Sequence, residues 1–287
     1  MSYPKGILIA IGGAEDKGAE ERKHINALNF SEEGVLKKIV ELASKKNRPI
    51  MEIITTASSI PEEVGRTYKQ SFKRLGCSDI GHLRIFDREE AESRKTLERL
   101  KRCNCIMFSG GDQLRLCSIL GGTQFISVLQ ERYEEEYFVI AGTSAGAAAM
   151  SATMISGPEE TSYLKGGIQL SMGFGLMQNV IIDTHFDARG RFGRLAQAIA
   201  TQPGQLGIGL DEDTAIIVER GVLLKTIGSS SVVIIDGSNV KHNYIADLKS
   251  GMPISVADLK VHILSNSDTY NIETHEFKSV GTKAYQK

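Results

Sequence analysis

Short apolar runs alternate with longer amphipathic segments along the first half of the chain. Five of these runs have the length and composition of buried strands: residues 5–11, 50–54, 82–86, 105–108 and 138–140. The segments between them repeat apolar residues at helical spacing: residues 31–46, 62–75, 88–102, 114–120 and 123–133. Strands and helices in alternation are typical of a mostly parallel central sheet with helices on both faces. The pattern therefore predicts an α/β fold.

The pattern changes after residue 151. Residues 155–175 are polar and rich in glycine and predict a loop, before a strand at 180–183 and a helix at 190–200. Residues 207–213 are predicted to form a strand that ends in an acidic turn, and short β-type runs follow: residues 214–218, 222–226, 231–235, 261–264 and 270–272. The chain shows no linker and no internal repeat. It is therefore predicted to be a single α/β domain, residues 1–287, with a β-rich C-terminal third.

The strongest local signal lies between the apolar run 138–140 and a segment rich in alanine. Gly142-Thr143-Ser144-Ala145-Gly146 fits the G-x-S-x-G nucleophile elbow, a sharp turn between strand and helix that only small neighbours allow. Such a turn lifts Ser144 off the sheet, with the free amide groups of a helix N-terminus behind it. The alternative is a glycine-rich turn with an incidental serine. In parallel sheets ligands bind beyond the carboxyl ends of the strands. The small turns after Ile11 and Phe108 are therefore also expected to lie at the site.

A nucleophilic serine needs a base within hydrogen-bonding reach, and the base needs a third group to orient it. Of the six histidines, only His185 lies in a segment that resembles a site, because it follows a predicted strand and precedes a helix that carries arginines. Five acidic residues are candidates for the orienting group: Asp183, Asp187, Asp211, Glu212 and Asp213. The residues alone leave the choice among these five open.

Three arginines, Arg189, Arg191 and Arg194, follow His185 closely. Arg191 and Arg194 are three positions apart and would share one face of a helix. Guanidinium groups beside a general base would suit a substrate that is rich in carboxylates. The alternative is a solvated basic face.

Composition narrows the class of protein. The chain has 287 residues, 41% apolar and 24% charged, which is typical of a soluble globular protein. A net charge of −1 gives no reason to expect nucleic acid or an anionic membrane as a partner. No apolar run approaches the roughly 18 residues of a membrane span, and the first is too short for a signal peptide, so a cytoplasmic location is expected. The four cysteines match no zinc pattern and are interpreted as structural cysteines in a reducing compartment: Cys77, Cys103, Cys105 and Cys117. Cys103 and Cys105 begin an apolar strand, where small buried thiols are common.

Five motifs occur in one order along the chain: GGAEDKG (12–18), SGGDQ (109–113), GTSAGA (142–147), DTHFDARGRFGRL (183–195) and GIGLDEDTA (207–215). On these motifs the chain resembles the cyanophycinases, of the serine peptidase family that also includes aspartyl dipeptidase (peptidase E). The resemblance covers most of the chain. It implies a class I glutamine amidotransferase-like or flavodoxin-like α/β fold.

By this resemblance Ser144 is the nucleophile, His185 the general base and Glu212 the acid that orients it. The order Ser, His, Glu differs from that of the α/β-hydrolases and argues against an ordinary esterase. Backbone amides of Gly111 and Ala145 would form the oxyanion hole. Further positions match substrate-binding residues of the family: Gln113, Asp183, Thr184, Arg189, Arg191 and Arg194. At Thr184 the chain departs from the pattern, because the family carries glutamine before the histidine.

The implied reaction is hydrolysis of the poly-aspartate backbone of cyanophycin to β-Asp-Arg dipeptides through an acyl-enzyme. Each unit of this polymer carries a free carboxylate and a guanidinium. The clustered arginines would meet the carboxylates, and Glu159, Glu160 or Asp187 would meet the guanidinium groups. No metal or cofactor is needed for this chemistry. The resemblance also implies a homodimer.

Two other functions stay open. The first is a peptidase E-like enzyme or isoaspartyl dipeptidase that acts on Asp-X or β-Asp-X peptides. The second is a non-catalytic member of the glutamine amidotransferase-like fold that serves as a binding or regulatory module.

Overall fold

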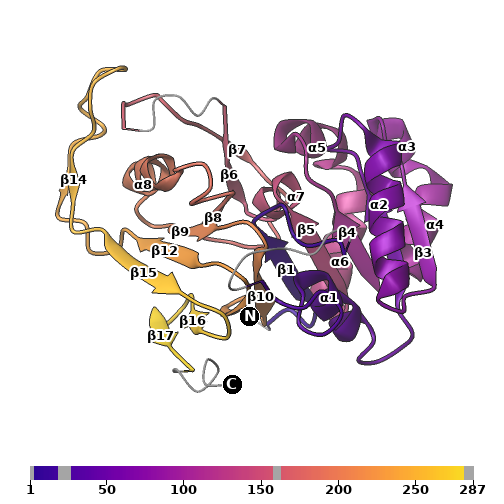
Figure 1. The fold of residues 1–287 in the computed structure, drawn as a ribbon. Coiled ribbons are helices and arrows are strands. Elements are labelled where there is room, and N and C mark those ends of the chain that lie inside the picture. Colours follow the sequence, from indigo (N-terminus) through magenta and orange to yellow (C-terminus); the bar gives the residue numbers. More distant parts are fainter. Residues whose placement is uncertain (1–2, 19–26, 158–162, 281–287) are drawn as a thin grey trace.

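The computed structural model describes residues 3–18, 27–157 and 163–280 (Figure 1). Its largest element is a nine-stranded sheet with the order β17-β16-β11-β10-β1-β5-β4-β2-β3. Five neighbouring strands of this sheet are parallel: β1 (Ile7–Ile11), β5 (Val139–Thr143), β4 (Cys105–Phe108), β2 (Ile50–Ile54) and β3 (Asp79–Leu83). Four antiparallel strands extend it: β10 (Thr214–Glu219), β11 (Leu223–Gly228), β16 (Thr269–Asn271) and β17 (Glu276–Lys278).

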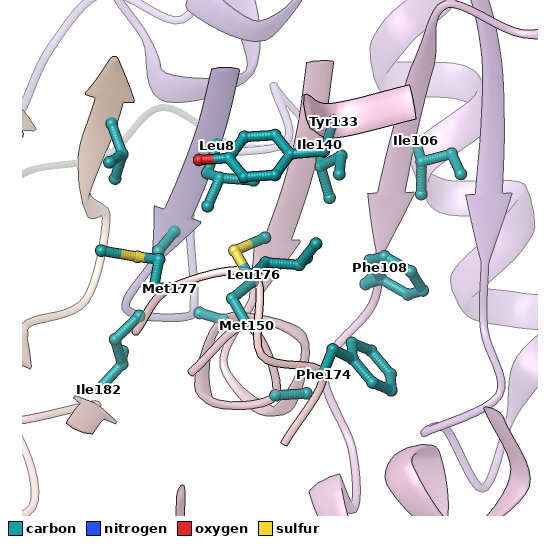
Figure 2. Packing of buried hydrophobic residues seen from close by; sticks show 14 of the residues in the cluster. Leu8, Ile106, Phe108, Tyr133, Ile140, Met150, Phe174, Leu176, Met177 and Ile182 are labelled. Carbon is teal, nitrogen blue, oxygen red and sulfur yellow. The ribbon is translucent and has the colours of Figure 1, made fainter. Parts of the chain in front are cut away.

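Side chains on alternating positions of β5 enter two different cores. Val139 and Ala141 pack with helices α1 (Val35–Ala43) and α2 (Pro61–Arg74). Ile140 faces the opposite core (Figure 2), to which five other helices contribute: α3 (Arg88–Glu92), α4 (Arg94–Arg102), α5 (Gln113–Leu120), α6 (Gln124–Glu135) and α7 (Ala145–Ala148). Because side chains alternate across a strand, a strand that is apolar at every position needs cover on both sides. The predicted α/β architecture with helices on both faces is confirmed.

A second sheet of four strands, in the order β15-β12-β9-β8, lies beside the central one (Figure 1). Its strands are β15 (Lys260–Leu264), β12 (Val232–Asp236), β9 (Leu206–Leu210) and β8 (Val180–Thr184), of which β8 and β9 are parallel. Helix α8 (Phe192–Thr201) packs on one face of this sheet. The other face joins the core of the central sheet through Ile182, near Met150 and Met177 (Figure 2). The sequence pattern predicts these strands individually but not their separation into a second sheet.

At two places the structure has different elements from those predicted. The helix expected over 88–102 is broken at Ser93, whose backbone is extended and whose hydroxyl caps α4 by accepting a hydrogen bond from Thr96 N–H. The loop expected over 155–175 contains strand β7 (Gln169–Met172), which pairs with β6 (Thr153–Ser156). A further small pair joins β13 (His242–Asn243) to β14 (Val256–Ala257).

The cysteine side chains lie apart as free thiols. Burial raises the pKa of Cys103 to about 12 and that of Cys117 to about 12, so neither thiol ionises readily at neutral pH. Within residues 3–18, 27–157 and 163–280, no three or more His, Cys, Asp or Glu side chains are arranged to hold a metal ion. No helix in the same described ranges is both long enough and apolar enough to cross a bilayer.

Candidate active site

A cavity of about 700 Å³ opens where the carboxyl ends of β1, β4 and β5 meet. These three parallel strands are neighbours, so the small turns that follow them come together at one edge of the sheet. The end of β8, from the second sheet, forms the opposite wall. Most of the predicted site residues line this cavity: Gly111, Gln113, Ser144, Asp183, Thr184, His185, Arg189, Arg191 and Arg194.

Ser144 lies in a sharp turn between β5 and the short helix α7 (Ala145–Ala148). Its backbone is in the left-handed region, at φ 51° and ψ −111°, which is strained for a residue with a side chain. Small residues on both sides make this turn sterically feasible, since a Cβ on Gly142 would lie 2.6 Å from the carbonyl oxygen of Gly146. The strand–turn–helix arrangement that the G-x-S-x-G pattern predicts is therefore present.

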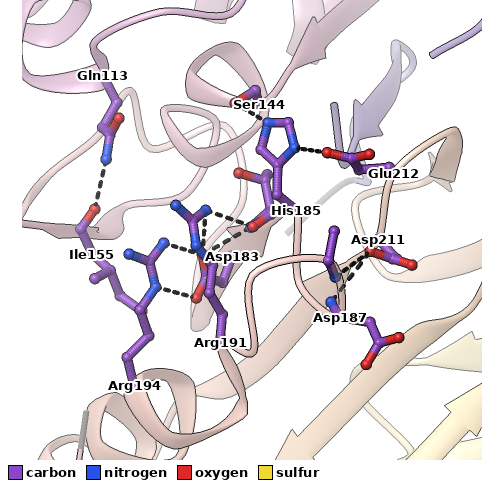
Figure 3. A network of polar contacts seen from close by, with 12 residues as sticks. Gln113, Ser144, Ile155, Asp183, His185, Asp187, Arg191, Arg194, Asp211 and Glu212 are labelled. Atoms are coloured by element: carbon purple, nitrogen blue, oxygen red, sulfur yellow. Dashed lines mark hydrogen bonds and ion pairs between the residues drawn. The ribbon is translucent and has the colours of Figure 1, made fainter. Parts of the chain in front are cut away.

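The side chains of Ser144, His185 and Glu212 form one hydrogen-bonded row (Figure 3). His185 Nε2 lies 3.0 Å from Ser144 Oγ, and His185 Nδ1 lies 2.6 Å from Glu212 Oε1. An ionised carboxylate only accepts, so Nδ1–H donates to Glu212 and Nε2 is left to accept the proton of the Ser144 hydroxyl. Glu212 does not line the cavity but lies behind the imidazole.

The other acids that the sequence left open are engaged elsewhere. Asp211 accepts hydrogen bonds from two backbone N–H groups in the turn that follows His185. Asp213 accepts one from a backbone N–H in the loop after β1. The carboxylate of Asp187 is exposed and points away from the row (Figure 3). Of these candidates, Glu212 is the one bonded to the imidazole.

Asp183 is buried between two guanidinium groups (Figure 3). Arg194 donates two hydrogen bonds to it, from Nε to Oδ2 at 2.7 Å and from Nη2 to Oδ1 at 2.5 Å. Arg191 Nη1 lies 3.6 Å from Oδ1 and donates to the carbonyl of Thr184 at 2.6 Å. Two guanidinium groups therefore contact one buried carboxylate in this wall of the cavity.

The pKa values in this group follow from burial. Burial raises the pKa of Asp183, and the hydrogen bonds and charge of Arg194 oppose that shift. Burial, together with the charge of Arg194, lowers the pKa of Arg191 to about 10. Arg191 thus keeps its positive charge at neutral pH.

The remaining predicted substrate contacts differ in their surroundings. Gln113 lines the cavity and donates from Nε2 to the carbonyl of Ile155 at 3.1 Å (Figure 3). Thr184 is buried in the cavity wall, whereas Arg189 is exposed at its rim. Glu159 and Glu160, which were expected to meet a guanidinium group, lie outside the described residues.

Two backbone segments flank the Ser144 hydroxyl. A Cβ on Gly110 would lie 3.9 Å from Ser144 Oγ, so the turn after β4 passes directly beside the nucleophile. The next residue, Gly111, has φ 139°, and Ala145 begins α7. The N–H groups of Gly111 and Ala145 donate no hydrogen bond to any residue within the described ranges. They are the two amides that the sequence predicts for an oxyanion hole.

The turn Ile11–Gly13, at the end of β1, has a role that the sequence patterns did not predict. Its three consecutive carbonyls accept hydrogen bonds from the backbone N–H groups of Ser144, His185 and Asp213, at 2.9, 2.8 and 2.9 Å. All three donors have a positive φ, between 48° and 51°. One turn therefore holds the backbone of Ser144, of His185 and of the residue next to Glu212. The paired glycines of GGAEDKG were the only sequence signal for it.

Known proteins match this chain over most of its length. Peptidase family S51 matches residues 8–226. The cyanophycinase of Synechococcus elongatus is 36% identical over 273 residues, which cover 95% of this chain and 81% of the relative. The cyanophycinase of Geminocystis herdmanii (strain PCC 6308) is 33% identical over 277 residues, 96% of each chain. The crystal structure of a peptidase from an acI-B1 Actinobacterium has the same fold, with a TM-score of 0.65 at 22% identity, over 94% of this chain and 98% of that one.

The region that the family matches contains the elbow, the hydrogen-bonded row and the buried arginines. The family match and the full-length relatives agree with the resemblance carried by the five sequence motifs. From its sequence and its fold together, this chain belongs to peptidase family S51, and it is a serine-type peptidase.

Proposed function

We propose that this peptidase is a cyanophycinase, an exopeptidase that hydrolyses the poly-aspartate backbone of cyanophycin to β-Asp-Arg dipeptides. Relatives that bear this name and share 33–36% of their residues over most of the chain support the substrate. The observation that carries the proposal is the row Ser144–His185–Glu212, whose serine and histidine line the same cavity as three arginine side chains.

In the proposed reaction Ser144 Oγ attacks the carbonyl carbon of an aspartyl backbone amide. His185 Nε2 takes the hydroxyl proton, and Glu212 stabilises the imidazolium through the bond to Nδ1–H. When the tetrahedral intermediate collapses, the C–N bond breaks and His185 gives the proton to the leaving amine. Water then hydrolyses the ester on Ser144, with His185 again as the base.

The negative oxygen of the tetrahedral intermediate needs donors that are already in place. We assign this task to the N–H groups of Gly111 and Ala145, on either side of Ser144. Their position beside the nucleophile, and the absence of a bonded acceptor within the described residues, support this assignment.

The arginine side chains that line the cavity would bind the free carboxylate of a cyanophycin unit. Arg191 and Arg194 lie in its wall, and Arg189 adds a third guanidinium at the rim. Asp183 would act by holding the two buried guanidinium groups in place. We expect Gln113 and Thr184 to contact the aspartyl unit beside the scissile bond, because both line the cavity. Thr184 is shorter than the glutamine of the family and leaves more room there.

The proposal also includes the domain organisation, the cellular location and the oligomeric state that the resemblance implies. We expect one domain over residues 1–287, with the class I glutamine amidotransferase-like or flavodoxin-like arrangement of its parallel strands. We also expect a cytoplasmic homodimer that works without a metal or other cofactor. Light scattering of the purified protein would test the dimer.

Mass spectrometry of the soluble products from cyanophycin granules tests the function. We expect one product mass, that of β-Asp-Arg, and a loss of at least about 10⁴-fold in rate for Ser144→Ala. Intact granules beside cleaved Asp-X or β-Asp-X dipeptides would instead identify a dipeptidase. A protein that cleaves none of these and does not react with a fluorophosphonate probe would be a binding or regulatory module.

A further inference from the structure

We propose that Glu15 is a positioning residue for the nucleophile, because its buried carboxylate holds Thr143, the residue immediately before Ser144. This inference rests on the proposed function, since it takes Ser144 to be the nucleophile. Glu15 lies in the loop after β1, far from Ser144 along the chain.

Three side chains converge on the Glu15 carboxylate. Thr143 Oγ1 donates to Oε2 at 2.6 Å. The hydroxyl of Tyr68, from α2, donates to Oε1, and Lys17 Nζ lies 3.0 Å from the same oxygen. The carboxylate thus connects its own loop, helix α2 and the last residue of β5.

The carboxylate is charged although it is buried. Burial by itself raises the pKa of Glu15, but the charge of Lys17 and the hydrogen bonds from Thr143 and Tyr68 outweigh burial and lower it. A buried charge destabilises a fold strongly unless it is paired and hydrogen-bonded. Lys17 also offsets the negative charge, which would otherwise oppose the oxyanion that forms beside Ser144.

Glu15 borders the cavity, but its side chain is 0% exposed and both of its carboxylate oxygens are already bound by protein side chains, so it does not act by touching the substrate. It can act through Thr143. The strained turn at Ser144 is held on one side by the hydrogen bond from its own N–H to the carbonyl of Ile11. The bond from Thr143 to Glu15 holds the chain just before the turn. Together the two bonds restrict where Ser144 Oγ lies relative to His185 Nε2.

The same cluster has a structural task that an experiment must separate from positioning. The hydroxyl of Ser71, from α2, donates to the carbonyl of Lys17 at 2.8 Å, so this loop is also attached to the helix. Replacing Glu15 alone would loosen the loop and the elbow together. Thr143→Val removes one donor to the carboxylate, preserves the side-chain shape and leaves the contacts with Tyr68 and Lys17 in place.

The test compares Thr143→Val, Thr143→Ser and Glu15→Gln in kcat, in KM and in the rate of Ser144 acylation by a fluorophosphonate. A displacement of the nucleophile by a fraction of an ångström to 1 Å predicts a loss of about 10- to 100-fold in kcat and in acylation rate, with KM within about twofold. Thr143→Ser, which restores the hydroxyl, should recover most of the loss. For Glu15→Gln, kcat and the acylation rate should fall as they do for Thr143→Val.

The matched control is Glu52→Gln. Glu52, on β2, is a second buried carboxylate; it accepts a hydrogen bond from Arg99 of α4 and does not line the cavity. This variant should lower the melting temperature and leave both rates of the folded enzyme unchanged. If Thr143→Val and Glu15→Gln also lower only the melting temperature, Glu15 is structural and the proposal is wrong.

The acylation rate separates this inference from the choice of substrate. A wild-type enzyme that leaves cyanophycin intact but reacts with the probe would refute cyanophycin as the substrate. The role of Glu15 could then still be tested, because the acylation rates of the variants do not depend on the substrate. A wild-type enzyme that does not react with the probe would overturn Ser144 as nucleophile, and the role of Glu15 with it.

Discussion

The imidazole of His185 occupies the space that a side chain on Gly13 would need. A Cβ on Gly13 would lie 2.3 Å from His185 Cε1 and 2.4 Å from Nε2, the nitrogen that faces Ser144. Gly13 also has φ 111°, which side-chain-bearing residues rarely adopt. The general base can therefore reach the nucleophile only because this position is glycine.

Gly13→Ala should displace the imidazole and reduce kcat by at least about 100-fold. The unfavourable φ should also lower the free energy of unfolding by about 1–3 kcal/mol. Steady-state kinetics and urea unfolding measure the two effects. Gly204→Ala is the control, because a Cβ there meets nothing within 4 Å. An active Gly13→Ala enzyme would mean that the imidazole is not held as the structure places it.

Glu212→Gln should leave the fold intact and reduce kcat by about 10³- to 10⁴-fold. The amide that replaces the carboxylate no longer stabilises the imidazolium or selects its tautomer. The comparison uses Glu219→Gln, an exposed change at the far end of β10, which should retain the wild-type rate. A loss below tenfold for Glu212→Gln would assign the orienting role to another group.

Asp183→Asn should destabilise the protein by about 3–5 kcal/mol, because it removes the charge of a buried carboxylate to which Arg194 donates two hydrogen bonds. Urea unfolding measures this loss. Asp79→Asn is the matched control, since Asp79 pairs with Arg102 at 3.4 Å on the surface, where a pair contributes less than about 1 kcal/mol. Similar losses for the two variants would show that the Asp183 carboxylate is not needed to hold the arginines.

Acid should destabilise the protein partly through Glu15. The pKa of this carboxyl lies below its usual value of 4.5 in the folded state, because Lys17, Thr143 and Tyr68 outweigh burial. Its charge therefore stabilises the fold at pH values above 4.5, and this stabilisation is lost as the pH falls through the folded value. Melting temperatures recorded from about pH 6 to about pH 3 should fall less steeply for Glu15→Gln than for wild type. A Glu33→Gln control, at an exposed position, should follow the wild-type curve, and equal slopes for all three proteins would contradict the prediction.

Local patterns predicted the central strands well. The strands at 50–54 and 105–108 have the predicted bounds, because every position in them is apolar or enclosed between neighbours. The third strand was placed too late, at 82–86 instead of Asp79–Leu83. It is the edge strand of the sheet and is only partly buried, so its apolar residues do not mark its bounds. Burial, which determines the pattern, is weakest at an edge.

Local sequence patterns could not identify the acidic partner of His185. Asp211, Glu212 and Asp213 are adjacent and equally acidic, and the residues by themselves did not separate them. The resemblance pointed to Glu212, and in the structure the direction of the chain after β9 aims this side chain at the imidazole. Its two neighbours face backbone amides instead.

The sequence by itself determined the alternation of strands and helices, the elbow around Ser144 and the family, because each depends on residues that are close in the chain or on motifs in a set order. Only the tertiary structure decided that β8 and β9 form a second sheet, that Arg194 binds Asp183, and that one turn after β1 holds the backbone of the nucleophile and the base. Hydrogen bonds across 41 residues, from Ser144 to His185, and across 27, from His185 to Glu212, depend on how whole sheets pack. No local pattern of apolar and polar residues specifies that packing.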